Sequence, residues 1–287
     1  VYQQTLNLTI SEKQKLRRLL EENYLPKNRV YRYNFFYDNC TTRARDIIEK
    51  CIEGKVVYSE GKERLSFRDI VHQYTKGHEW DELGIDMCLG SEADKPIDTR
   101  KQMFAPFYML EAAKKATIVV GDSVRPLILH EKKVVDVEPE DVREGFPLSP
   151  MVCVFILIGV TCFVGWLQFK IRKIIWIWDL LLFGVQGLAG CVITFLVFFS
   201  THPTVGSNWL ILLLNPIPLI YLPVMVYRAI KGKKDYYHTI NIVCLTSFMM
   251  IMPFIQQKFN VTVLPLALCL LICSANHVLL YYRQNNK

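Results

Sequence analysis

Cys40 is the residue of this chain best placed to do chemistry. It follows the aromatic and β-branched stretch from Val30 to Tyr37, which predicts a strand. After it, apolar residues recur at helical spacing and predict a helix with one apolar face. These residues are Ala44, Ile47, Ile48, Cys51 and Ile52. Cys40 is therefore expected where the strand ends and the helix begins, with Asp38 and Asn39 forming the turn and capping the helix.

A cysteine in this position suits nucleophilic catalysis. Unpaired N–H groups in a first helical turn, together with the positive end of the helix dipole, favour a thiolate. The same N–H groups can bind an oxyanion. A second interpretation stays open, in which Cys40 is a small core residue, because free cysteine is among the most buried residue types. Asn39 and Arg43 either shape the site, or form a helix cap and a surface ion pair.

Charge and hydropathy divide the chain into two unlike halves. The whole chain holds 34 Lys and Arg against 27 Asp and Glu, whereas residues 148–287 hold 10 against 2. Most cations of the second half lie in short loops between long apolar runs. This pattern is typical of membrane topology and argues against a nucleic-acid-binding face.

The second half is predicted to cross a membrane five times, because each apolar run is long enough for a bilayer that needs about 20 residues. The expected spans are 149–168, 174–200, 209–227, 239–255 and 261–282. The loops 169–173 and 228–237 and the C-terminus are basic, so we expect them in the cytoplasm. The first half then lies on the outer side of the membrane.

The first half, with 147 residues before the apolar runs, is long enough for its own core. We expect a thiol-enzyme domain over 1–131, an acidic linker over 132–147 and the membrane domain over 148–287. Expected elements are a strand over 1–10, a helix opened by the capping box Ser11–Gln14, helices from Ser66 and over 103–116, and strands within 117–130. His72, His78 and His130 are expected to be structural or surface residues.

The cysteines do not form a disulfide framework, although a Cys51–Cys88 bridge stays open. The chain begins at Val1 without a signal peptide, so we expect that an N-terminal part of the natural protein, with the export signal, precedes it.

The outer loop from Ser200 to Trp209 is a further candidate site. It carries His202 and Asn208 on the side expected for Cys40, and Asn215-Pro216 follows early in the third span. A broken span beneath a polar loop can open a groove to lipid. The alternative is that the tryptophan anchors the interface and the prolines are tolerated kinks. In the first half, Asp86 either orients a catalytic partner or caps a turn.

The stretch Tyr33–Asp46, with its Asn-Cys-Thr-Thr-Arg core, resembles the signature of the Bacteroides-type lipoprotein N-acyltransferase family, Lnb. The stretches at Ser66–Asp69, 84–90, 103–106 and 202–216 fit the same family in order. The resemblance implies an α+β papain-like domain of the permuted NlpC/LRAT kind, incomplete at its N-terminus, followed by an all-α domain of five membrane helices. It also implies that Cys40 is the nucleophile.

The family's histidine precedes its cysteine, and this chain has no histidine before Cys40. The chain is therefore expected to lack its general base, unless a residue such as His202 replaces it. Thr201 stands where the family pattern implies an acid, which leaves a catalytic role for His202 open.

The function implied is acyl transfer from a phospholipid to the N-terminal amine of a lipoprotein through a thioester, at the inner membrane. We expect no cofactor, no metal and no nucleic-acid partner. Two alternatives remain: an NlpC-type cysteine peptidase or amidase that acts on cell-wall peptides, and a non-catalytic membrane scaffold that binds lipoproteins.

Overall fold

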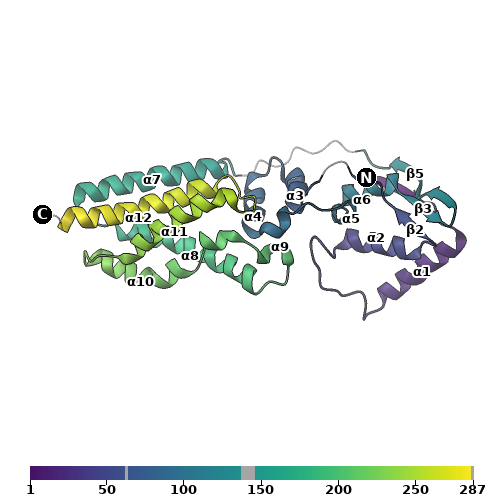
Figure 1. The fold of residues 1–287 in the computed structure, drawn as a ribbon, viewed down its shortest axis with the longest axis horizontal. Helices are drawn as coiled ribbons and strands as arrows, with labels where there is room; N and C mark the ends of the chain where they lie inside the picture. The colour runs from purple at the N-terminus through teal and green to yellow at the C-terminus, as the bar shows by residue number, and fades with distance from the viewer. Residues whose placement is uncertain (62–63, 137–145, 286–287) are drawn as a thin grey trace. The chain divides into compact units, whose positions relative to one another are not determined.

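The computed structural model describes residues 1–61, 64–136 and 146–285. They form two compact units (Figure 1). Unit 1 comprises residues 1–71 and 95–143, and unit 2 comprises residues 72–94 and 144–287, each within its described part. Residues 72–94, which precede the apolar half by more than fifty positions, therefore pack with the apolar helices.

Unit 1 contains two small antiparallel sheets. β1 (Tyr2–Leu6) pairs with β5 (Ile128–Lys133), so the first strand of the chain is hydrogen-bonded to the last strand of unit 1. The second sheet has the order β2 (Lys55–Val57), β3 (Thr117–Val120) and β4 (Ser123–Pro126). Gly121 makes the tight turn between β3 and β4 with φ 57°, a conformation that favours glycine. The strands expected within 117–130 are present, as three short strands.

Four helices lie wholly within unit 1. They are α1 (Ile10–Tyr24), α2 (Cys40–Cys51), α5 (Thr99–Gln102) and α6 (Pro106–Lys115). The core between helices and sheets is apolar and contains Leu6, Leu16, Leu19, Ile48, Cys51, Ile118 and Leu127. Cys51 is a free thiol, as is Cys88 of unit 2, so no disulfide joins them.

The cap of α1 lies two residues before the predicted one. Thr9, not Ser11, is the N-cap: its hydroxyl accepts the Glu12 N–H, and the Glu12 carboxylate accepts the Thr9 N–H. The Glu12 carboxylate also accepts a hydrogen bond from the Arg125 guanidinium, and Glu12 is fully buried. Burial alone would raise the pKa of Glu12, but the Thr9 and Glu53 backbone N–H groups and Arg125 outweigh it and lower that pKa.

The strand predicted over 30–37 is absent, and this prediction was wrong. Residues 30–33 form no regular structure, and a turn closed by a bridge between Asn34 and Asp38 follows them. The Asn34 side chain accepts the N–H groups of Phe36 and Tyr37, which holds the turn. The aromatic residues that suggested a strand contribute instead to a cluster of rings.

Unit 2 is built on five apolar helical segments long enough to cross a membrane, counted among the described residues. These are α7 (Pro150–Ile171), α8 (Trp176–Phe198), the broken segment Pro203–Ile230, α11 (Tyr236–Ile251) with its extension to Phe254, and α12 (Val263–Asn285). They match the five predicted spans. The linker predicted over 132–147 falls largely on residues 137–145, outside the described residues.

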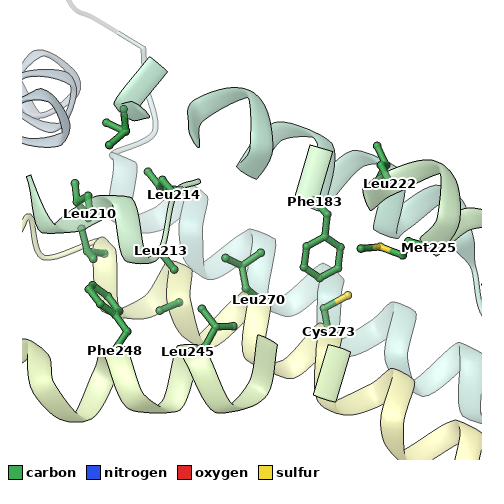
Figure 2. Packing of buried hydrophobic residues seen from close by; sticks show 13 residues of the cluster. Phe183, Leu210, Leu213, Leu214, Leu222, Met225, Leu245, Phe248, Leu270 and Cys273 are labelled. Carbon is green, nitrogen blue, oxygen red and sulfur yellow. The ribbon is translucent and has the colours of Figure 1, made fainter. Parts of the chain in front are cut away.

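The helices of unit 2 pack through small residues and a shared apolar core. On α8, a Cβ at Gly187 would lie 2.5 Å from the Leu219 side chain, and one at Gly190 would lie 2.2 Å from the Asn215 backbone. α8 can therefore approach α10 (Ile217–Ile230) closely. Figure 2 shows the core that α8 and α10 share with α11 and α12, where Phe183 lies near Leu222 and Met225.

The third span is broken, as its prolines predicted. It consists of α9 (Pro203–Gly206), a 3₁₀ turn over Trp209–Leu212, and α10, which begins after Pro216. Two further α-helices are short, and a 3₁₀ helix covers Ser91–Asp94. α3 (Phe67–Thr75) contains the division between the units, and α4 (Glu79–Cys88) belongs to unit 2.

Candidate active site

A cluster of aromatic rings supports the turn before Cys40. The Phe36 ring is buried, with its centroid 4.5 Å from that of Phe67 and 5.1 Å from that of Phe104. Tyr37 packs edge-on against Phe67 at 5.2 Å. Aromatic pairs at these separations are favourable beyond the area they bury. The cluster therefore fixes residues 35–37, while Phe35 stays half exposed.

Asn39 caps the start of α2 and is buried, with both atoms of its side-chain amide paired. Its Oδ1 accepts the N–H groups of Thr41 and Thr42, each at 2.9 Å. Its Nδ2 donates to the carbonyls of Phe35 (2.9 Å) and Phe104 (2.8 Å). Its own N–H donates to the Thr42 hydroxyl, which completes a capping box. Asn39 thus joins the aromatic turn, the start of α2 and residue 104.

Cys40 is the first residue of α2 and its side chain is exposed. Its Sγ lies 4.0 Å from the Thr41 hydroxyl, and it has no histidine partner among the described residues. Within that part of the chain its backbone N–H has no acceptor either. Because Asn39 occupies the N–H groups of Thr41 and Thr42, the Cys40 N–H is the one first-turn donor left for an incoming oxygen. The sequence predicted several unpaired N–H groups in the first turn of α2, and this prediction was wrong.

Tyr33 is a titratable residue that interacts electrostatically with Cys40. Burial raises the pKa of Tyr33, and negative charge at Cys40 and at Tyr31 raises it further. A phenol that stays protonated beside Cys40 is a hydrogen-bond donor. Tyr33 is 49% exposed, so it can turn toward a substrate. Sequence reasoning did not single it out, because the strand prediction assigned it to regular structure.

Arg43 holds the loop before the turn against α2. Its guanidinium makes two hydrogen bonds to Asp38, at 2.7 and 2.9 Å, and lies 3.4 Å from the centre of the Tyr31 ring. The hydrogen bond to Asp38 raises the pKa of Arg43. An arginine paired in this bidentate way positions its neighbours, which matches the ion-pair alternative for this residue.

Asp86 lies in unit 2, on α4, and is buried. One carboxylate oxygen lies 2.8 Å from His72 Nε2, and the other accepts the Asn260 amide at 3.0 Å. A carboxylate that orients an imidazole is the usual support of a general base. His72, expected to be structural, thus has the partner that such a base needs; spacing in the sequence gave no signal for this pair.

Asn208 is buried and joins three segments of unit 2. Its Nδ2 donates to the Met87 carbonyl (2.7 Å), and its Oδ1 accepts from Leu210 N–H and Gln257 Nε2, each at 3.0 Å. Next to it, the Gly90 N–H donates to Thr204. The loop that contains Asn208 is therefore bound to residues 87–90 and to residue 257.

His202 is the residue before α9, and its side chain makes no capping hydrogen bond. It is half-buried, and its backbone N–H donates to the Ser200 hydroxyl at 3.2 Å. The structure thus groups Asn39, Cys40 and Arg43 in unit 1, and Asp86, His202 and Asn208 in unit 2.

Two groups of side chains in unit 2 have the composition of metal sites, among the described residues. His72, Glu82 and Asp86 form one, and Asp179, Cys273 and His277 form the other. In each group, one ligand atom per residue lies within 4.8 Å of the others. The first is partly exposed, while all three members of the second are buried.

Comparison with known proteins agrees with this two-part structure. A family model described as the Lnb N-terminal periplasmic domain matches residues 1–76, and one described as the Lnb transmembrane domain matches residues 141–285. Searches of curated proteins and of solved structures find no match. Since the transmembrane match alone covers half of the chain, the resemblance seen in the sequence is confirmed, and the chain belongs to the Lnb family of lipoprotein N-acyltransferases.

Proposed function

We propose that this protein is a membrane-bound N-acyltransferase of lipoproteins, with Cys40 as its nucleophile. The observation that carries the assignment is the exposed Cys40 sulfur at the first residue of α2, beside a backbone N–H without an acceptor among the described residues. The positive end of the helix favours negative charge at this position. Family membership, a periplasmic domain and five membrane-spanning segments supply the context.

The first half-reaction transfers the acyl group to the enzyme. The Cys40 thiolate attacks the ester carbonyl of a phospholipid acyl chain, and the Cys40 N–H donates to the oxyanion that forms. The carbon–oxygen ester bond then breaks. The lysophospholipid leaves as an alcohol after it takes up one proton, and the acyl chain stays on Cys40 as a thioester.

The second half-reaction forms the product. The free α-amine of the lipidated N-terminal cysteine of a lipoprotein attacks the thioester carbonyl and loses one proton. The carbon–sulfur bond breaks, an amide forms and the thiolate is regenerated. An ester is exchanged for an amide, so the transfer is favourable as a whole.

The same proposal orients unit 2 in the membrane. Trp80 of α4 donates to the Leu148 carbonyl at 2.8 Å, and residues 87–90 bind the loop after α8. This end of the bundle is the periplasmic one in our proposal. The opposite end carries Arg172, Arg228 and Lys233, and the C-terminus follows it into the cytoplasm, in agreement with the excess of cations there.

The test is replacement of Cys40 by Ala in the full-length protein, placed in phospholipid vesicles with a lipoprotein acceptor. We expect N-acylation to fall by on the order of 10³-fold or more, because the covalent route is lost. The control is Cys162→Ala, which removes an exposed cysteine on α7 and leaves α2 intact. Mass spectrometry of lipoprotein N-termini gives the readout.

Two results would contradict the assignment. N-acylation at the wild-type rate in Cys40→Ala would remove the nucleophile from the mechanism. Turnover of cell-wall peptides that depends on Cys40, with no acyl transfer by the wild type, would favour the peptidase alternative instead.

A further inference from the structure

A buried polar cluster lies inside the membrane helices of unit 2, apart from Cys40. Asp179 comes from α8, and Cys273 and His277 come from α12. His277 Nε2 lies 2.8 Å from one Asp179 oxygen, and Cys273 Sγ lies 3.5 Å from the other. Ionisable side chains within membrane helices are costly and usually have a function.

A neighbouring histidine has unmet bonding capacity. The His238 ring of α11 stacks on the His277 ring, with centroids 3.8 Å apart. Its Nδ1 lies 3.3 Å from the Ser274 hydroxyl, whereas its Nε2 is buried and has no hydrogen-bond partner in the described part of the chain. An orphaned imidazole nitrogen in an apolar interior is unfavourable unless something else binds it.

We propose that Asp179, Cys273 and His277 bind a divalent transition-metal ion, with Zn²⁺ as the best fit. Carboxylate, thiolate and imidazole are the donors that Zn²⁺ takes in proteins. Bond lengths of about 2.0–2.3 Å place neighbouring ligand atoms of a tetrahedral site about 3.3–3.8 Å apart. The Cys273–Asp179 separation already lies in that range, and the His277–Asp179 pair must open by well under about 1 Å.

The charges of the three ligands also favour a divalent cation. A carboxylate and a thiolate carry two negative charges, which one divalent cation neutralises, and an apolar interior favours a neutral assembly. The fourth position is then available to a water molecule. Binding releases the thiol proton of Cys273 to solvent, since the thiolate is the ligand.

A small cavity adjoins the site at the basic end of the bundle. His277 lines this cavity of about 30 Å³, together with Arg228, Asp235 and Tyr281. The site joins α8 to α12, so we assign the ion a structural role in the membrane unit.

The test uses the full-length protein in detergent, stripped of metal by a chelator and titrated with Co²⁺ and then Zn²⁺. We expect one ion per chain and a thiolate-to-cobalt charge-transfer absorption band that Zn²⁺ removes. Cys273→Ser should abolish the band, and both Cys273→Ser and His277→Gln should weaken Zn²⁺ binding by at least about 100-fold.

The matched control is Cys269→Ser. Cys269 is buried one turn earlier on α12 and contacts Thr161 at 3.2 Å, so its loss should leave the band unchanged. If Cys273→Ser fails to fold, the charge-transfer band of the wild type and of Cys269→Ser still tests the proposal. Absence of the charge-transfer band in the wild type, or equal Zn²⁺ affinity in the wild type and a folded Cys273→Ser, would overturn the proposal and leave a hydrogen-bonded cluster.

Discussion

Asn39 of unit 1 and Asn208 of unit 2 are both buried asparagines that cap a helical turn. The Oδ1 atom of each accepts two hydrogen bonds, and each Nδ2 donates to a backbone carbonyl far away in the sequence. The following residues differ. Cys40 is exposed and its N–H is free among the described residues, whereas the Trp209 N–H donates to Gln257.

The comparison shows that an asparagine cap can either leave a neighbouring N–H group open or help to join separate segments. In unit 1, Asn39 occupies the N–H groups of Thr41 and Thr42, and leaves a single donor beside an accessible sulfur. In unit 2, Asn208 and Gln257 accept the N–H groups of Leu210 and Trp209 and join separate segments. The unpaired N–H group of Cys40 marks the candidate site, whereas the paired groups around Asn208 have a structural role.

The largest effect should come from Asn39→Ala. It removes a helix cap and leaves the carbonyl of Phe35 and the buried carbonyl of Phe104 without their donor, which together should cost about 3 kcal/mol of unfolding free energy. The rate of Cys40 alkylation, followed by peptide mapping, should change at the same time, because the start of α2 loses its support.

Asn208→Ala is the matched partner of that change. It should destabilise unit 2 by about 2–3 kcal/mol, since three hydrogen bonds are lost, and leave Cys40 alkylation unaltered. Equal changes of Cys40 reactivity in both variants would erase the distinction between an open site and a structural joint.

Gly90→Ala should come next. A Cβ at Gly90 would lie 2.6–2.8 Å from the backbone of Ser207 and Asn208, so the joint around Asn208 must open. Thermal unfolding should show a loss of about 2 kcal/mol. Gly84→Ala on the exposed face of α4 is the control: nothing lies within 4 Å of its Cβ, and the helix should become slightly more stable. A harmless Gly90→Ala would show that the two segments do not meet closely.

Glu12→Gln should destabilise unit 1 without touching Cys40, by about 1.5 kcal/mol at neutral pH. The pKa of Glu12 is below its ordinary value of 4.5, so the carboxylate stabilises the fold above that pH and less as pH falls through its folded pKa. The difference between wild type and variant should therefore shrink below pH 4.5. Chemical denaturation between pH 7 and pH 3 measures it, and a difference that grows with acid would contradict the burial of an ionised Glu12.

Arg43→Lys should have the smallest effect, below about 1 kcal/mol in stability, because the ion pair is partly exposed. Lysine keeps the charge but loses the bidentate contact with Asp38 and the stacking on Tyr31. A fall in acyl transfer of only a few fold is expected. A loss as large as that of Cys40→Ala would show that Arg43 contacts substrate directly.

The membrane half could be predicted from sequence because long apolar runs and basic loops follow directly from bilayer physics. The helix that begins at Cys40 was also predictable, since Asn39 is a strong cap and the apolar spacing is regular. Residues 30–37 were predicted wrongly. Their aromatic side chains have strand propensity, but packing of Phe36 on Phe67 and Phe104 outweighs it.

Other features depend on contacts that no local pattern encodes. The pair of His72 and Asp86 spans 14 residues, and Asp179 meets His277 across 98 residues. Their partners are set by how α4 and α12 pack, which hydropathy does not specify. The same holds for residues 72–94, whose polar sequence gave no sign that they pack with the apolar helices.

The central claim is that the Cys40 sulfur carries the acyl group. The direct measurement is mass spectrometry of the full-length protein incubated with phospholipid in the absence of a lipoprotein amine. The account predicts one acyl chain on the peptide that contains Cys40, released by hydroxylamine and absent from Cys40→Ala. An acyl chain on a different residue, or N-acylation that proceeds after Cys40 has been blocked by alkylation, would contradict it.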